Sequence, residues 1–411
     1  MTRRSMVVAV VLLLAGSGGL LTQGRSLQRA DPQSVGLNAT KLAEATGLLE
    51  QFVADQKIAG AVAAVARKGK LAYIESAGVQ DLATRAPMTE RSLFRIYSMT
   101  KSVTSVAVLM LLEDGKFRLD DPVSKYLSEF KTVAVASRDG TTHPPSRDIT
   151  IEDLLLHTSG LNHRTSAEYQ RAQVRSRAIP LPQFISNIVR VPLMEDPGTR
   201  WRYSESPTVL GRLIEIWSGK PFDAFLEERV FKPLAMVDTG FWVRPEQRSR
   251  LTTVYEPAEG GGLRPFEIEA LPFTERPRLI EGAVGLVSTV PDYLRFSQML
   301  LNKGELDGVR LLTPKTVAMM TANGLSDVLL KSRAGGVMGW GLANVNVVMD
   351  PAGVPYPASR GEYGWDGSAG TIFWIDPGKE MITVLMTQSS PADPDRLRRR
   401  FKTIVEQAVV Q

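Results

Sequence analysis

Two pairs of short apolar segments, one near each end of the chain, most constrain how this sequence can fold. The first pair spans 59–66 and 71–77, and the second pair spans 371–375 and 381–387. The second turn, at 376–379, reads Asp-Pro-Gly-Lys, in which proline sets one backbone dihedral and glycine permits the next. Apolar runs joined by glycine-containing turns are typical of β-hairpins. We expect both chain ends to share one antiparallel sheet, with the middle of the chain as an inserted domain.

The residues between the two hairpins carry signals for helices and long loops. Thr150 and Asp153 form a capping pattern before an apolar run, and Ser206 followed by Pro207 is typical of an N-cap with proline at the first helical position. Residues 240–280 are rich in proline, glycine and glutamate and are expected to form loops. The predicted limits are 35–120 and 282–410 for the sheet subdomain and 121–281 for the helical and loop subdomain.

The composition excludes several classes of site. The 411 residues include no cysteine, which excludes a thiol nucleophile, disulfides and thiolate-ligated metals. The three histidines, His143, His157 and His163, form no His-Glu-x-x-His pattern, so we expect no metal and no cofactor. The net charge of +5 is a mild bias, and the basic run at 396–402 is interpreted as a solvated helix face rather than a nucleic-acid site.

Residues 1–25 are typical of an export signal. Arg3 and Arg4 precede an apolar run, Met6 to Ala15, and small residues follow. This run is short for a membrane span, although an uncleaved anchor is the alternative. We expect a periplasmic or secreted protein that contacts a membrane only through this segment, if the segment is retained.

A serine and a lysine three residues apart are the first candidate catalytic pair. Ser98 and Lys101 would share one face of a helix, about one turn apart. A serine hydroxyl needs a neighbour that accepts its proton, and a lysine can do so if burial lowers its pKa. The apolar run from Val103 to Gly115 predicts a buried helix with Ser98 at its N-terminus. A second serine–lysine pair of the same spacing begins at Ser128, but it has polar surroundings and no such helix. The alternative is that Ser98 is a simple N-cap.

Two further stretches could complete a site. Tyr203 lies just before the predicted helix at 206, and a tyrosine near a lysine can act as a base, although most tyrosines serve in packing. The glycine-rich stretch 363–370 precedes a predicted strand, along which a substrate could lie, although glycine-rich turns before strands are common.

Three motifs in this order resemble those of the serine β-lactamase-related hydrolases, in particular the class C β-lactamase and family VIII carboxylesterase branch. The motifs are Ser98-Met99-Thr100-Lys101, Tyr203-Ser204-Glu205 and Trp365-Asp366-Gly367. The resemblance covers roughly residues 35–410. It implies an α+β, β-lactamase/transpeptidase-like fold, with an antiparallel sheet flanked by helices and an inserted all-helical domain.

The resemblance also implies residue roles. Ser98 would attack a carbonyl and form an acyl-enzyme, Lys101 would hold Ser98 and share its proton, and Tyr203 would act as general base. The backbone N–H groups of Ser98 and Ser368 would form the oxyanion hole. His157 would be structural. The absence of Gly-x-Ser-x-Gly argues against an α/β-hydrolase.

The motifs depart from those of β-lactamases at the substrate-binding positions. Trp365 replaces the lysine of a Lys-Thr-Gly motif, and Asp366 adds a negative charge next to Gly367. Glu205 replaces an asparagine, and an ionised glutamate accepts hydrogen bonds without donating them. Glu205 would also favour the protonated form of Lys101. These departures predict a carboxylesterase for neutral acyl groups rather than an efficient β-lactamase.

Two alternatives remain open at this point. The first is a D-amino-acid peptidase or DD-carboxypeptidase-like enzyme, which also fits a small-molecule ester or amide substrate. The second is a catalytically weak binding or regulatory relative, motivated by Glu205. Trapping by labelled penicillin would favour the first, and ligand binding without ester turnover would favour the second.

Overall fold

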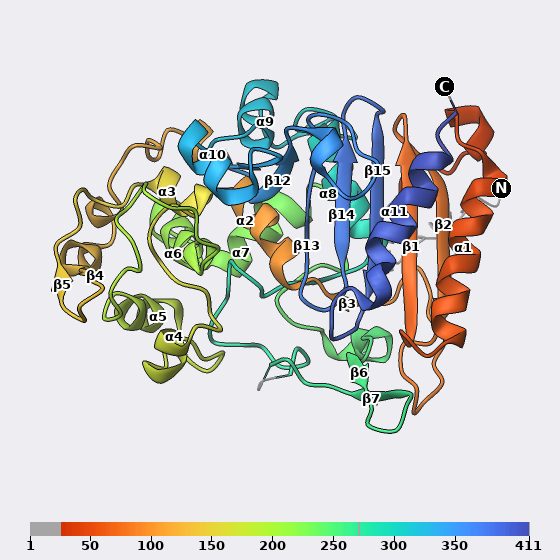
Figure 1. Ribbon diagram of the computed structural model, residues 1–411, viewed down its shortest axis with the longest axis horizontal. Helices are drawn as coiled ribbons and strands as arrows, with labels where there is room; N and C mark the ends of the chain where they lie inside the picture. The colour runs from red at the N-terminus through yellow and green to blue at the C-terminus, as the bar shows by residue number, and fades with distance from the viewer. Residues whose placement is uncertain (1–25, 270–271, 411) are drawn as a thin grey trace, which may run out of the picture.

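One antiparallel sheet of seven strands joins the two ends of the chain in the computed structural model, which describes residues 26–269 and 272–410 (Figure 1). The predicted export signal lies outside the described residues. The strand order is β11-β12-β13-β14-β15-β1-β2, and β15 pairs with β1 so that the two predicted hairpins lie side by side. The predicted antiparallel sheet is confirmed. Its strands are β1 (Gly60–Arg67), β2 (Lys70–Gly78), β11 (Met338–Gly341), β12 (Val345–Val348), β13 (Tyr363–Asp366), β14 (Ile372–Asp376) and β15 (Met381–Thr387).

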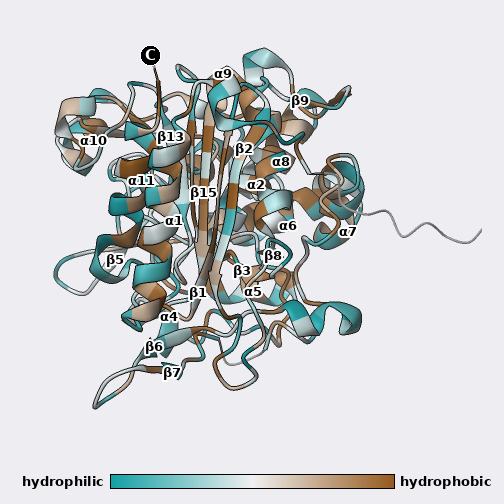
Figure 2. Ribbon diagram, turned by 90° about the vertical axis from the view of Figure 1, so that its right-hand side faces the viewer, coloured by the Kyte–Doolittle hydropathy of each residue, from teal (hydrophilic) through white to brown (hydrophobic). Residues whose placement is uncertain are grey.

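Helices cover both faces of this sheet (Figure 2). Successive side chains of a strand point to opposite faces. In β1, Val62 and Ala64 therefore belong to the core beneath α2 (Thr100–Glu113) and α8 (Val290–Leu301), whereas Ala61 and Ala63 belong to the core beneath α1 (Ala39–Ala54) and α11 (Leu397–Gln407). Burial on both faces explains why β1 is an unbroken apolar run rather than an alternating one.

The remaining helices lie mainly at the end of the molecule away from α1 (Figure 1). They are α3 (Ile151–Leu156), α4 (Ala167–Arg171), α5 (Leu181–Ile188), α6 (Ser206–Ser218), α7 (Phe222–Leu226), α9 (Pro314–Thr321) and α10 (Asp327–Ala334). The predicted capping box between Thr150 and Asp153 is present at the start of α3. The subdomain limits proposed from the sequence stay a prediction.

Four short strand pairs hold the loops between these layers. They are β3 (Phe94–Arg95) with β8 (Val287–Ser288), β4 (Val135–Ala136) with β5 (Thr142–His143), β6 (Tyr255–Pro257) with β7 (Leu263–Pro265), and β9 (Glu305–Leu306) with β10 (Val309–Arg310). No helix within the described residues is both long and apolar enough to cross a bilayer.

Helix α6 begins one residue earlier than the sequence predicts. Glu205 occupies the N-cap, and Pro207 takes the second helical position rather than the first. The hydroxyl of Ser206, predicted to cap the helix, instead lies 2.9 Å from that of Ser159 and 2.8 Å from that of Ser204. Contacts with another loop therefore outcompete the local capping preference of a serine followed by proline.

Candidate active site

Ser98 lies in a tight turn, Tyr97–Met99, that leads directly into α2. Tyr97 has φ +39°, in the left-handed region that a residue with a Cβ adopts only when its surroundings impose it. An edge-on contact with the Phe273 ring, at 5.9 Å between centroids, holds the Tyr97 ring. The Tyr293 hydroxyl donates to the Met99 carbonyl at 3.0 Å, which ties the turn to α8. Strain and anchoring together fix the backbone beside the candidate nucleophile.

Lys101 points its ammonium at Ser98 from within the core. Its Nζ donates to Ser98 Oγ at 3.3 Å and to the Ala283 carbonyl at 2.8 Å, and the side chain is 1% exposed. Burial lowers the pKa of Lys101 to about 7, and the charge of Glu205 opposes this change. A neutral lysine is therefore well populated near neutral pH and can accept a proton from Ser98.

Tyr203 closes the other side of this group. Its hydroxyl accepts a hydrogen bond from the Trp365 indole N–H at 3.0 Å, and Lys101 Nζ lies 4.6 Å from its ring centroid. Burial raises the pKa of Tyr203 above its ordinary value, while hydrogen bonds to Ser98 and Trp365 act in the opposite direction. The structure thus brings Tyr203 to Ser98 and Lys101, from two distant stretches of the sequence. The directions of the two pKa changes favour Lys101 over Tyr203 as the first proton acceptor.

His157 supports the loop that carries Tyr203. Its Nδ1 accepts from the Ser204 backbone N–H at 3.2 Å and lies 2.9 Å from Ser204 Oγ, and its ring centroid is 4.9 Å from that of Tyr203. Complete burial and the charge of Lys101 lower the pKa of His157 well below its ordinary value. A neutral, buried imidazole with these contacts fits the structural role implied by the family resemblance. Trp201 and Trp340 extend the aromatic packing around Tyr203.

The end of β13 places Ser368 beside the nucleophile turn. A Cβ on Gly367 would lie 2.5 Å from the Ile96 carbonyl oxygen and 2.3 Å from Thr371 Oγ1, so only glycine allows this close approach. Among the described residues, the backbone N–H of Ser368 has no hydrogen-bond acceptor. The arrangement is suited to an oxyanion hole shared with the Ser98 amide, which stays a prediction.

Asp366 and Glu205 differ in how their charges are compensated. Asp366 forms an ion pair with Arg398 of α11 at 2.5 Å, and the same guanidinium donates to the Gly367 carbonyl at 2.8 Å. Arg398 therefore offsets the negative charge that the sequence places beside the third motif. Glu205 is 1% exposed, accepts from Thr208 Oγ1 at 3.0 Å and forms no ion pair with Lys101. Their predicted substrate contacts, like those of Trp365 and Gly367, stay predictions.

An ion network that the sequence reasoning missed lies next to Ser368. Arg164 donates to Ser368 Oγ at 3.5 Å and pairs with Glu269 at 2.5 Å. Glu269 also pairs with Arg175 at 2.9 Å, and Arg175 pairs with Glu281 at 2.7 Å. Glu281 lies two residues before Ala283, whose carbonyl accepts a hydrogen bond from Lys101. These residues come from loops far apart in the sequence and form no recognisable motif.

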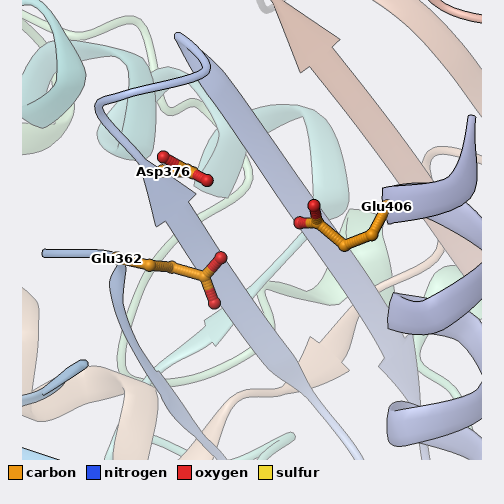
Figure 3. Close-up of side chains that lie close together, drawn as sticks. All are labelled: Glu362, Asp376 and Glu406. Atoms are coloured by element: carbon orange, nitrogen blue, oxygen red, sulfur yellow. The ribbon is translucent and has the colours of Figure 1, made fainter. Parts of the chain in front are cut away.

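A second charged cluster lies beneath α11, away from this site (Figure 3). Glu362, Asp376 and Glu406 bring carboxylate oxygens within 4.8 Å of one another. Lys402 pairs with Glu362 at 2.7 Å and with Glu406 at 2.6 Å, and Lys379 pairs with Asp376 at 2.9 Å and with Glu406 at 2.7 Å. Two ammonium groups therefore already bind the three carboxylates. The cluster is an internal ion network that fastens α11 to the sheet.

Comparison with known proteins finds relatives that match most of the chain. A family model described as "Beta-lactamase" matches residues 45–407. Protein Rv1367c of Mycobacterium tuberculosis is 36% identical over 350 residues, covering 81% of this chain and 86% of its own. Esterase EstB of Burkholderia gladioli is 29% identical, covering 88% of this chain and 94% of its own.

A solved structure also resembles the fold of this chain. It is described as "EstCE1, a hydrolase with promiscuous acyltransferase activity" and superposes with a TM-score of 0.78 at 25% identity, covering 90% of this chain and 99% of the other. The family match spans most of the chain, and the structural match spans nearly the whole of its counterpart. The chain therefore belongs to the beta-lactamase family and is a serine hydrolase with that fold.

Proposed function

We propose that this protein hydrolyses esters of small carboxylic acids through an acyl-enzyme on Ser98. The observation that carries the proposal is the contact between the Ser98 hydroxyl and the buried amine of Lys101, whose pKa is lowered to about 7. Such a lysine can activate a serine at neutral pH without a histidine. The names of EstB and EstCE1, an esterase and a hydrolase with acyltransferase activity, support the same reaction class.

Each proton in the proposed reaction has a place among the three residues. Ser98 Oγ attacks the ester carbonyl, and its proton passes to neutral Lys101. The amides of Ser98 and Ser368 stabilise the oxyanion. When the alkoxide leaves, Tyr203 donates its proton to it and takes the proton held by Lys101. Water then attacks the acyl-enzyme: Tyr203 passes its proton to neutral Lys101 and takes the proton of the water. The Lys101 ammonium returns a proton to Ser98 Oγ as the carboxylic acid leaves, which restores the starting state.

The third and second motifs support ester rather than β-lactam hydrolysis. β-Lactamases of this type present a lysine ammonium at the position of Trp365. Trp365 instead offers an apolar surface and one N–H, and this N–H already donates to Tyr203. Glu205 is buried and can only accept hydrogen bonds while it is ionised. Neither residue can supply the positive charge or the amide donor that an antibiotic of the penicillin type requires at these positions. We also propose that the enzyme is exported, on the basis of the pattern at 1–25.

The test is 4-nitrophenyl butyrate hydrolysis by wild type and by Ser98→Ala. We expect turnover by wild type, a mass increase of one butyryl group on the peptide containing Ser98, and loss of both in the variant. Ser128→Ala is the matched control, because Ser128 is exposed and begins the other Ser-x-x-Lys sequence. Penicillin or cephalosporin turnover comparable with ester turnover would contradict the esterase assignment.

A further inference from the structure

A cavity of about 950 Å³ opens beside the ion network of Arg164 and lies between α4, α5 and the loop that carries Glu269. Ligand sites for small molecules commonly have volumes of about 300–1,000 Å³. Its lining is unusually cationic for a site of this size, because it includes Arg164, Arg175 and Arg190 but only one carboxylate, Glu269. The remaining lining side chains are mostly neutral and hydrogen-bonding, which is unlike a pocket for a fatty acyl chain.

Arg164 connects this cavity to the reaction centre. Its guanidinium lines the cavity, donates to Ser368 Oγ at 3.5 Å and lies 5.8 Å from the centroid of the Tyr97 ring. Tyr97 and Ser368 flank the proposed oxyanion hole. Arg164 therefore lies between the predicted oxyanion hole and the cavity.

The ion pairs on the cavity wall contain as many arginines as glutamates, so their charges balance when these residues are taken alone. Arg164 and Arg175 share Glu269, and Arg175 also pairs with Glu281. The buried Nε of Arg164 nevertheless has no hydrogen-bond partner among the described residues, and one Nη contacts only a neutral hydroxyl. Arg164 therefore keeps donor capacity for a further anion.

Two further arginines make the region positive. Arg177 is 4% exposed, lies 3.9 Å from the Phe273 ring centroid, and has no hydrogen-bond partner in the described part of the chain for any guanidinium nitrogen. Arg190 is exposed at the cavity and forms no ion pair with a described residue. The two carboxylates already named leave two of the four cations uncompensated. Glu205 also interacts electrostatically with Arg175, and when its charge is counted one cation is still uncompensated.

We propose that the natural substrate is an ester that carries a carboxylate, and that this carboxylate enters the cavity and binds Arg164 and Arg190. An excess of one or two positive charges suits a monoanion, and the guanidinium group matches the geometry of a carboxylate. The apolar part of the substrate packs against Trp365, which does not line the cavity. The inference deepens the proposed function and rests on it for the identity of the scissile bond.

The test compares matched pairs of esters that differ in one carboxylate. Mono-4-nitrophenyl glutarate against methyl 4-nitrophenyl glutarate places the charge on the acyl side, and 4-(butyryloxy)benzoate against its methyl ester places it on the alcohol side. We expect kcat/KM to favour the carboxylate member at least tenfold in one pair, with a preference that weakens at high salt. That preference should fall in Arg164→Gln and Arg190→Gln. Arg171→Gln should retain it, because Arg171 lies on α4, is exposed and does not line the cavity.

Two results separate failure of this inference from failure of the proposed function. Equal or better turnover of the neutral member of both pairs, or a preference unchanged in both arginine variants, would overturn the carboxylate site while leaving the esterase intact. If no ester is turned over, calorimetric binding of mono-methyl glutarate to Ser98→Ala still tests the site. Binding that is lost with Arg164→Gln and kept with Arg171→Gln supports it, and absence of binding refutes it.

Discussion

The indole N–H of Trp365 provides a sharp test of how the active site handles its protons. It donates to the Tyr203 hydroxyl at 3.0 Å. Trp365→Phe removes this donor but keeps an aromatic ring between Trp340 and Tyr203, whose centroids lie 4.7 Å and 5.3 Å from that of Trp365. The variant therefore isolates one hydrogen bond from the surrounding packing.

The expected effect follows from the charge that develops on the Tyr203 oxygen. A hydrogen bond to a neutral acceptor contributes about 0.5–1.5 kcal/mol, and one to a charged acceptor about 1.5–3 kcal/mol. Only the difference, about 1–1.5 kcal/mol, favours the charged transition state over the ground state, so kcat/KM should fall about tenfold. The pKa of Tyr203 should rise further, since the donor stabilises the phenolate.

The assay is 4-nitrophenyl butyrate hydrolysis between pH 6 and 10, with the amplitude of the acylation burst measured in parallel. Trp374→Phe is the control, because Trp374 lies on the neighbouring strand β14 with its ring 5.6 Å from the Lys402 ammonium, on the α11 side. Wild-type kcat/KM in Trp365→Phe would refute the reasoning. The Tyr203 oxygen would then carry no charge in the rate-limiting step.

Three further predictions concern buried ionisable groups. Burial lowers the pKa of Lys101 to about 7, and its neutral form is the proposed base, so kcat/KM should rise as the pH passes through about 7. Stopped-flow measurement of acylation should show no such rise in Lys101→Arg. Glu205→Gln removes a charge that raises this pKa, so the rising limb should move to lower pH; an unmoved limb, with Thr208→Val as control, would exclude this coupling. Burial raises the pKa of Glu362 from 4.5 to about 7. Its protonated form therefore contributes up to about 3 kcal/mol to the free energy of unfolding, a contribution that is complete below pH 4.5 and is lost as the pH rises through 7. Urea unfolding should therefore show that Glu362→Gln gains stability relative to wild type over this range, and a constant difference would contradict the assignment.

The sequence was sufficient for features that depend on local patterns. The hairpin turns predicted β1–β2 and β14–β15 because proline and glycine act within a few residues, and the buried helix after Ser98 was visible as an unbroken apolar run. The three motifs indicated which residues would meet, although nothing in their spacing placed the Trp365 N–H on Tyr203.

Features that depend on contacts between loops could not be predicted in this way. Arg164 and Glu269 are separated by more than a hundred residues, and neither stands in a pattern that distinguishes it from the other charged residues of the loops. The start of α6 was misplaced by one residue for the same reason, since the hydroxyl of Ser206 is engaged by Ser159 from another loop. Tertiary contacts of this kind leave no periodic signal.

The pairing of β15 with β1 has a consequence for when the enzyme becomes active. Ala61 lies opposite Thr387, so strands separated by most of the chain must meet before the sheet can form. Contacts of such high sequence separation make folding slow, because the entropy of closing a very long loop is lost before the contacts compensate for it. Ser368 lies between β13 and β14, the strands that complete this sheet. A nascent chain that contains Ser98, Lys101 and Tyr203 but not yet Ser368 therefore lacks the second predicted oxyanion donor. We expect hydrolysis to begin only once the strands around Ser368 have been synthesised and paired.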